Sequence, residues 1–133
     1  MLKSVLIKDY MATSLITFNE ATTIVEAIQY LNTHKISGAP VVDKDGGLIG
    51  MLSEKDCLKV ALQSSYYEDW VAGSVTDYMS TEIKTIQEME SIVDLAEMFS
   101  KTSLKRAPVL NDAGKLVGQI SRSDVLRALE KLW

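Results

Sequence analysis

The sequence predicts a mixed α/β (α+β) fold, in which two similar β-α-β-β-α units pack sheet to sheet in one globular module with pseudo-twofold symmetry. The first observation behind this prediction is an internal repeat that spans most of the 133 residues. The second is that both copies show the same order of extended and helical patterns. The third is size, because neither copy alone is long enough to form a comfortable core. Having only two copies favours a paired module over a solenoid.

The repeat keeps a single offset of 68 positions without a gap. Asp9-Tyr10-Met11 returns as Asp77-Tyr78-Met79, and Ala39-Pro40-Val41 returns as Ala107-Pro108-Val109. Later in the repeat, Gly50 pairs with Gly118, Ser53 with Ser121 and Asp56 with Asp124. Chance matches would not keep one register over this span. We therefore expect a first unit at residues 1–60, a connector at 61–74 and a second unit at 75–133.

Each unit is expected to begin with a short extended segment, at residues 15–18 and 83–86, and to continue into a helix. The helices are indicated by apolar residues at helical spacing, which start at Ile24 in the first copy and at Ile92 in the second. Each helix start has a hydroxyl residue three positions before an acid, a pattern typical of a capping box. The two pairs are Thr23 with Glu26 and Ser91 with Asp94.

A β-hairpin follows in each copy, with strands at residues 39–42 and 48–52 and at residues 107–110 and 116–120. Asp, Asn and Gly between the paired strands supply the turn conformations that a hairpin needs. Proline cannot donate a hydrogen bond to a neighbouring strand, so we expect Pro40 and Pro108 at the starts of their strands. A second helix closes each unit, and we expect the aromatic-rich connector to pack onto the module.

Composition limits the classes of function. The chain is 47% apolar and 24% charged with a net charge of −4, and no basic patch indicates a nucleic-acid partner. His34 and Cys57 are the single histidine and cysteine, so neither a usual zinc site nor an internal disulfide is expected. No apolar stretch approaches the length of a membrane helix, and no signal peptide is evident. We expect a cytoplasmic protein without membrane insertion.

Ser53-x-x-Asp56 and Ser121-x-x-Asp124 allow two interpretations. As structural elements they are capping boxes at helix starts, and the spacing alone favours this interpretation. As binding elements they combine a helix N-terminus that can hold a phosphate with an acid that can accept two hydrogen bonds from the cis diol of a ribose. The apolar strand beside each motif could flank an adenine.

The ordered set of motifs, present twice, resembles a tandem pair of CBS domains, the ligand-sensing module named after cystathionine β-synthase. The resemblance covers about residues 5–132. It rests on Asp-Tyr-Met followed by Thr13 or Thr81, on the two Ala-Pro-Val strands and on the two Gly-x-x-Ser-x-x-Asp segments. It implies two clefts related by the pseudo-twofold, which commonly hold AMP, ADP, ATP or S-adenosylmethionine. Such a molecule would be a regulatory ligand and not an obligatory cofactor.

The resemblance also implies roles for individual residues. Asp56 and Asp124 correspond to ribose ligands, and Ser53 and Ser121 to phosphate or ribose ligands. Residues at the start of each unit and backbone next to the proline contact the base in the family. The corresponding residues here are Thr13, Ile16, Ala39 and Pro40, together with Thr81, Lys84, Ala107 and Pro108.

The two motifs differ in charge. The second copy has Lys105 and Arg106 before its Ala-Pro pair, and Arg122 inside its Ser-x-x-Asp segment, where the first copy has Glu54. Cationic side chains stabilise phosphate through charge-assisted hydrogen bonds, so we expect greater phosphate tolerance on the side that uses Arg122. Alternatively, Lys105 and Arg106 are solvated surface charges.

The leading hypothesis is a regulatory module, not an enzyme, that binds an adenosine ligand and signals to an unknown protein target in trans, with an output such as energy sensing. The signal would be a conformational change or a change in dimer packing, because the resemblance also implies a homodimer. An alternative is a module that dimerises or acts as a scaffold without a ligand. A remote alternative is a nucleotide-processing enzyme, although no metal cluster, Walker loop or activated nucleophile is present in the sequence.

Overall fold

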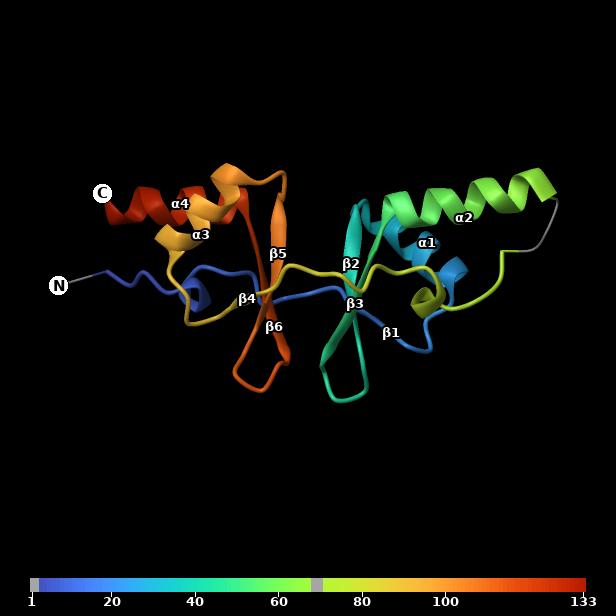
Figure 1. Cartoon of the computed structure of the whole chain (residues 1–133), viewed down its shortest axis with the longest axis horizontal. Coiled ribbons are helices and arrows are strands. Elements are labelled where there is room, and N and C mark those ends of the chain that lie inside the picture. The colour runs from blue at the N-terminus through green and yellow to red at the C-terminus, as the bar shows by residue number, and fades with distance from the viewer. Residues whose placement is uncertain (1–2, 68–70) are drawn as a thin grey trace. The chain divides into compact units, whose positions relative to one another are not determined.

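The computed structural model describes residues 3–67 and 71–133, which form two compact units (Figure 1). We call Ile16–Ile83 the central unit. The C-terminal unit combines Lys84–Trp133 with the described residues of Met1–Leu15. Each unit therefore contains most of one repeat copy and the opening segment of the other copy. The boundaries at residues 1–60, 61–74 and 75–133 describe the copies of the sequence repeat and not these structural units. They stay a prediction.

The central unit contains a three-stranded sheet and two α-helices. Its elements are β1 (Phe18–Asn19), α1 (Ile24–His34), β2 (Gly38–Val42), β3 (Leu48–Ser53), α2 (Glu54–Tyr67) and the 3₁₀ helix η2 (Val75–Asp77). The strand order is β1-β2-β3, with β1 parallel and β3 antiparallel to the central β2. The helix α2 extends beyond the expected start of the connector at residue 61, and the packing expected for the aromatic residues of the connector falls largely outside the part that can be described.

The C-terminal unit repeats this plan. Its elements are the 3₁₀ helix η1 (Ile7–Asp9), β4 (Ile86–Gln87), α3 (Ile92–Lys101), β5 (Arg106–Leu110), β6 (Leu116–Ser121) and α4 (Arg122–Leu132). The strand order is β4-β5-β6 with the same directions, and α3 lies beside α4 (Figure 1). The predicted mixed fold of two β-α-β-β-α units is confirmed, although the opening strand of each unit has only two residues and begins later than expected.

One of the two expected capping boxes at α1 and α3 is present. The Thr23 side chain accepts a hydrogen bond from the Glu26 amide at 3.1 Å, and the Thr23 amide donates to the Glu26 carboxylate at 3.2 Å. The expectation for α3 was wrong in detail, because Ser91 accepts from the amide of Val93 instead. A cap on this earlier amide still satisfies one of the free donors at the helix start.

The prolines lie inside their strands and not at the starts, contrary to the prediction. Pro40 is third in β2 and lies opposite Met51, whose amide and carbonyl both bond Ser80 at 2.9 Å. Residues of a non-hydrogen-bonded antiparallel pair direct their backbone groups away from each other. The Pro40 nitrogen therefore points away from β3, and β1 pairs with β2 only from Val41 onward, so no strand bond is lost.

Pro108 in β5 has the same surroundings. It lies opposite Gln119, and the backbone of Gln119 exchanges two hydrogen bonds of 2.9 Å with Ala12. β4 joins β5 only from Val109 onward. Both units thus accommodate a proline in a central strand by leaving the same position unpaired on one side.

Each unit has its own hydrophobic core, built between its sheet and its two helices. Ile7, which precedes the first copy's Asp-Tyr-Met, is 1% exposed in the core of the C-terminal unit. Val75, its repeat equivalent, is fully buried in the core of the central unit. The opening segment of each copy thus completes the core that the other copy's sheet and helices begin.

Candidate functional site

Both Ser-x-x-Asp motifs lie where a strand runs directly into a helix. Ser53 ends β3 and is followed at once by α2, and Ser121 ends β6 and is followed at once by α4. Because no loop intervenes, the serine is both the last strand residue and the helix cap. This geometry holds the acid three residues later against the helix start.

The two motifs form the same capping box. In each, the serine amide and hydroxyl both donate to Oδ2 of the aspartate at 2.9 Å. The aspartate amide donates to the serine Oγ at 3.2 Å. The structural interpretation of Ser53 with Asp56 and of Ser121 with Asp124 is therefore confirmed, and their role as ligand-binding residues stays a prediction.

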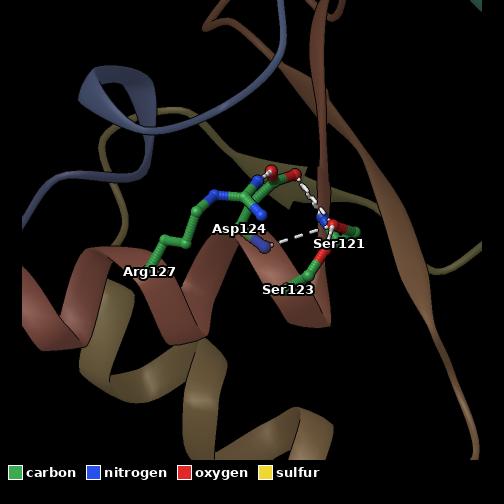
Figure 2. Close-up of polar contacts among 4 residues, drawn as sticks. All are labelled: Ser121, Ser123, Asp124 and Arg127. Carbon is green, nitrogen blue, oxygen red and sulfur yellow. Dashed lines mark hydrogen bonds and ion pairs between the residues drawn. The ribbon is translucent and has the colours of Figure 1, made fainter.

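The motif in the C-terminal unit has an additional partner on the aspartate. Arg127, one turn further along α4, forms an ion pair with Oδ1 of Asp124, the oxygen that the capping box does not use (Figure 2). The Ser123 hydroxyl lies 3.0 Å from the Ser121 hydroxyl on the other side of the motif (Figure 2). Arg127 lies outside the repeated motif, although its spacing of three residues from Asp124 is a sequence signal for a helical ion pair.

Arg122 has different partners from those its position in the motif suggests. Its guanidinium donates to the carbonyl oxygens of Thr102 at 2.7 Å and Phe99 at 3.5 Å, at the end of α3. A cation at the negative end of a helix is stabilised by the last carbonyl groups of that helix. Its predicted phosphate contact stays a prediction and would require these bonds to break.

Lys105 and Arg106 both have exposed side chains. The Lys105 carbonyl accepts a hydrogen bond of 3.0 Å from the Arg122 amide, and the Ser37 carbonyl accepts one of 2.8 Å from the Glu54 amide. The first amide of each helix is therefore already bonded to backbone. A phosphate at either helix start would have to use other donors.

The structure divides the expected base contacts between the units in a way that the repeat did not indicate. Thr13 follows Ala12, which pairs with β6, so Thr13 belongs with the Asp124 motif. Thr81 follows Ser80, which pairs with β3, so Thr81 belongs with the Asp56 motif. The central unit also contains Ile16, Ala39 and Pro40, and the C-terminal unit also contains Lys84, Ala107 and Pro108.

Cys57 lies next to Asp56 in the first turns of α2 and is buried. Burial raises the pKa of its thiol above the ordinary value of 9.0, and the carboxylates of Asp56 and Glu54 raise the pKa further. The thiol is therefore kept neutral and unreactive, as expected for a small apolar residue in a core. Within residues 3–67 and 71–133, no group of three or more His, Cys, Asp and Glu side chains is arranged to hold a metal.

The CBS domain family matches residues 7–63 and residues 75–131. The chain belongs to the CBS domain family. A CBS domain-containing protein of Dictyostelium discoideum is 34% identical over 136 residues, which cover 96% of this chain and 93% of that protein. The resemblance inferred from the motifs is thus confirmed over nearly the whole chain.

Two solved CBS pairs combine sequence similarity with a known ligand. The structure of CBSX2 in complex with AMP is 26% identical, has a TM-score of 0.80 and matches 97% of this chain and 98% of that chain. The CBS pair of the protein MJ0100, in complex with 5-methylthioadenosine and S-adenosyl-L-methionine, is 27% identical with a TM-score of 0.73, and matches 95% of this chain and 96% of that chain. In the present chain, none of the helices that the structure describes has the length and apolar character needed to cross a bilayer.

Proposed function

We propose that this CBS pair is a regulatory module that binds an adenosine ligand, such as AMP, ADP, ATP or S-adenosylmethionine, at its Ser-x-x-Asp motifs. The observation that carries the proposal is the position of the two aspartates. Each carboxylate is held by Oδ2 in a capping box, which leaves Oδ1 as an acceptor outside the cap. A carboxylate fixed in this way can accept hydrogen bonds from the cis diol of a ribose.

The ligand class is supported by the similar proteins. CBSX2 is known with AMP, and the MJ0100 pair with two other adenosine compounds. These three ligands share adenosine and differ in the group at the 5′ end. We therefore assign ribose recognition to Asp56 and Asp124, with Ser53 and Ser121 beside the 5′ group and Thr13 and Thr81 on the side of the base.

The proposed regulatory effect of the ligand is a change in how the module binds another protein. A ligand that binds one conformation better than another shifts the population toward that conformation. A second copy of the chain is the first such partner, because both units have apolar grooves on their helices. One groove, of about 370 Å³, is lined mainly by α1 and α2 and includes Ile28, Leu31 and Leu58. The other, of about 410 Å³, is lined mainly by α3 and α4 and includes Phe99 and Leu126.

The test is a thermal-shift titration with AMP, ADP, ATP and S-adenosylmethionine on the wild type, Asp56→Ala, Asp124→Ala and the double variant. A ligand at a hundred times its dissociation constant stabilises the folded state by about 2.7 kcal/mol. For a chain of this length we expect an increase in Tm of roughly 8 to 13 °C. The shift should shrink in each single variant and vanish in the double variant.

Loss of a capping box also lowers stability, so the titration needs a matched control. Glu26→Ala removes the carboxylate of the capping box at α1, which has no proposed ligand. It should lower the Tm of the free protein, as the two aspartate variants do, and keep the full ligand shift. A wild type that responds to none of the four ligands would favour a scaffold module instead, and turnover of a nucleotide by the purified protein would favour an enzyme.

A further inference from the structure

The two aspartates differ in how much of their hydrogen-bonding capacity is already used. An ionised carboxylate has about four acceptor positions on its two oxygens. For Asp124, the Ser121 amide and hydroxyl occupy two positions on Oδ2, and Arg127 occupies one on Oδ1 (Figure 2). No other group in the described part of the chain bonds this carboxylate, so one acceptor position is left.

Asp56 retains more capacity. The Ser53 amide and hydroxyl again occupy two positions on Oδ2. Lys59 stands where Arg127 stands in the repeat, and among the residues that the structure describes neither it nor any other group bonds Oδ1 of Asp56. Two acceptor positions are therefore left on this carboxylate.

We propose that Arg127 makes the two candidate sites unequal: the Asp56 motif can accept both hydroxyls of a ribose diol directly, whereas the Asp124 motif can accept both only when Arg127 releases Oδ1. A cis diol donates two hydrogen bonds, which match the two free positions on Asp56 and exceed the one on Asp124. This inference rests on the proposed function and names the residue that sets the order in which the sites fill. The Asp56 motif fills first.

The ion pair is built so that it can open without disturbing the cap. The side chain of Arg127 is 65% exposed, whereas that of Asp124 is 18% exposed. Release of the guanidinium therefore returns a charged group to water, and the carboxylate stays fixed through its two bonds to Ser121. Exposed ion pairs contribute little free energy, so the difference in affinity caused by Arg127 is about two- to fivefold.

Arg127 is a specificity residue that the charge pattern of the motif did not reveal. Arg122 lies nearer in sequence to Ser121, but its guanidinium bonds carbonyl groups at the end of α3. Arg127 reaches back along α4 to the carboxylate (Figure 2). The charged group that bonds Asp124, the proposed ribose-binding residue, thus lies one turn beyond the motif.

The experiment measures the affinity of adenosine by isothermal titration calorimetry, since adenosine has the diol and no phosphate that an arginine could bind. Asp56→Ala leaves only the Asp124 motif able to bind a ribose. The double variant Asp56→Ala/Arg127→Ala then removes the ion pair from this remaining motif. We expect the double variant to bind adenosine about two- to fivefold more tightly than Asp56→Ala. The matched control compares Asp124→Ala with Asp124→Ala/Lys59→Ala. We expect these two variants to bind adenosine with the same affinity.

A second measurement compares Asp56→Ala with Asp56→Ala/Arg127→Ala, so that only binding at the Asp124 motif is measured and the added substitution alters an exposed side chain. 2′-Deoxyadenosine lacks one hydroxyl of the diol and needs a single acceptor position, so its affinity should be the same in both proteins. Only the affinity for adenosine should increase when the Arg127 side chain is removed. An equal gain for both nucleosides, or none for adenosine, would overturn the role of Arg127.

The outcomes separate the two proposals. If Asp56→Ala binds adenosine and Arg127→Ala leaves that binding unchanged or weaker, the proposed function stands and the inference about Arg127 is wrong. If the wild type binds neither adenosine nor any of the four larger ligands, the proposed function fails and this inference fails with it.

Discussion

At the scale of single residues, Cys57 shows how one position can serve the fold beside a candidate site without taking part in chemistry. Its thiol is 7% exposed, and it stands where the second copy has Val125, which is 4% exposed. Burial raises the pKa of the thiol, and the neighbouring carboxylates of Asp56 and Glu54 raise it further. The side chain thus behaves as a small apolar group in the core of the central unit.

The raised pKa predicts a loss of stability in alkaline solution. The folded state keeps the thiol proton to a higher pH than the unfolded state, whose thiol ionises near the ordinary value of 9.0. The stabilisation is complete below that pH and is lost as the pH rises through the folded-state pKa. Cys57→Val removes the titrating group and restores the residue type of the other copy.

Urea unfolding of the wild type and Cys57→Val at pH 7 and pH 10 measures this effect. We expect the wild type to lose more free energy of unfolding than the variant between the two pH values. The lysines and tyrosines titrate in both proteins, so the difference between the two losses reports on Cys57. Equal losses would show that the pKa of the thiol is the same in the folded and unfolded states.

At the scale of elements, the methionine of each Asp-Tyr-Met motif packs against the glycine of the Gly-x-x-Ser motif in the other copy. A Cβ atom on Gly118 in β6 would lie 2.4 Å from Sδ of Met11, and one on Gly50 in β3 would lie 2.2 Å from Sδ of Met79. The methionine of each copy therefore fills the space that a side chain on the other copy's glycine would need. A side chain at either position would have to displace the methionine, so this close approach favours glycine at both.

Gly118→Ala should lower the free energy of unfolding by about 1–3 kcal/mol, because the added methyl group overpacks the contact with Met11. Shortening the partner in Met11→Ala/Gly118→Ala should recover part of this loss. The measurement is a double-mutant cycle by chemical denaturation, in which contacting residues couple by about 0.5–3 kcal/mol. Additive losses would mean that Met11 does not pack on Gly118 in solution.

At the scale of the whole molecule, the proposed homodimer would form at the exposed leucines of the helical grooves. Leu58 on α2 is 68% exposed and Leu126, its repeat equivalent on α4, is 66% exposed. Large exposed apolar side chains beside apolar grooves are typical of protein–protein interfaces. Because the repeat places the same groove on both units, a twofold dimer can use a self-complementary surface.

Leu58→Glu/Leu126→Glu should convert the proposed dimer to a monomer, since it places charges in an apolar interface. Size-exclusion chromatography with light scattering measures the change in mass at several protein concentrations. Met89→Glu is the matched control, because Met89 is 54% exposed and does not line either groove. Two outcomes contradict this interface: a wild-type protein that is monomeric throughout, and a dimer that the double variant leaves intact.

The sequence by itself determined the repeat, the order of strands and helices in each copy, the family resemblance and the two Ser-x-x-Asp capping boxes. These features depend on local preferences, namely periodic apolar residues, turn residues and bonds between residues three apart, and such preferences are present in the order of residues. The same local information misplaced Pro40 and Pro108 within their strands and assigned a reciprocal cap to Ser91.

Only the tertiary structure decided which segments lie together. The repeat shows that Met11 and Met79 are equivalent, but equivalence does not reveal that each packs on the glycine of the other copy. Likewise, the motif suggested Arg122 as the cation beside the second site, whereas its guanidinium bonds carbonyl groups at the end of α3 and Arg127 takes the free oxygen of Asp124. A long side chain can reach several partners, and the packing of neighbouring elements selects among them.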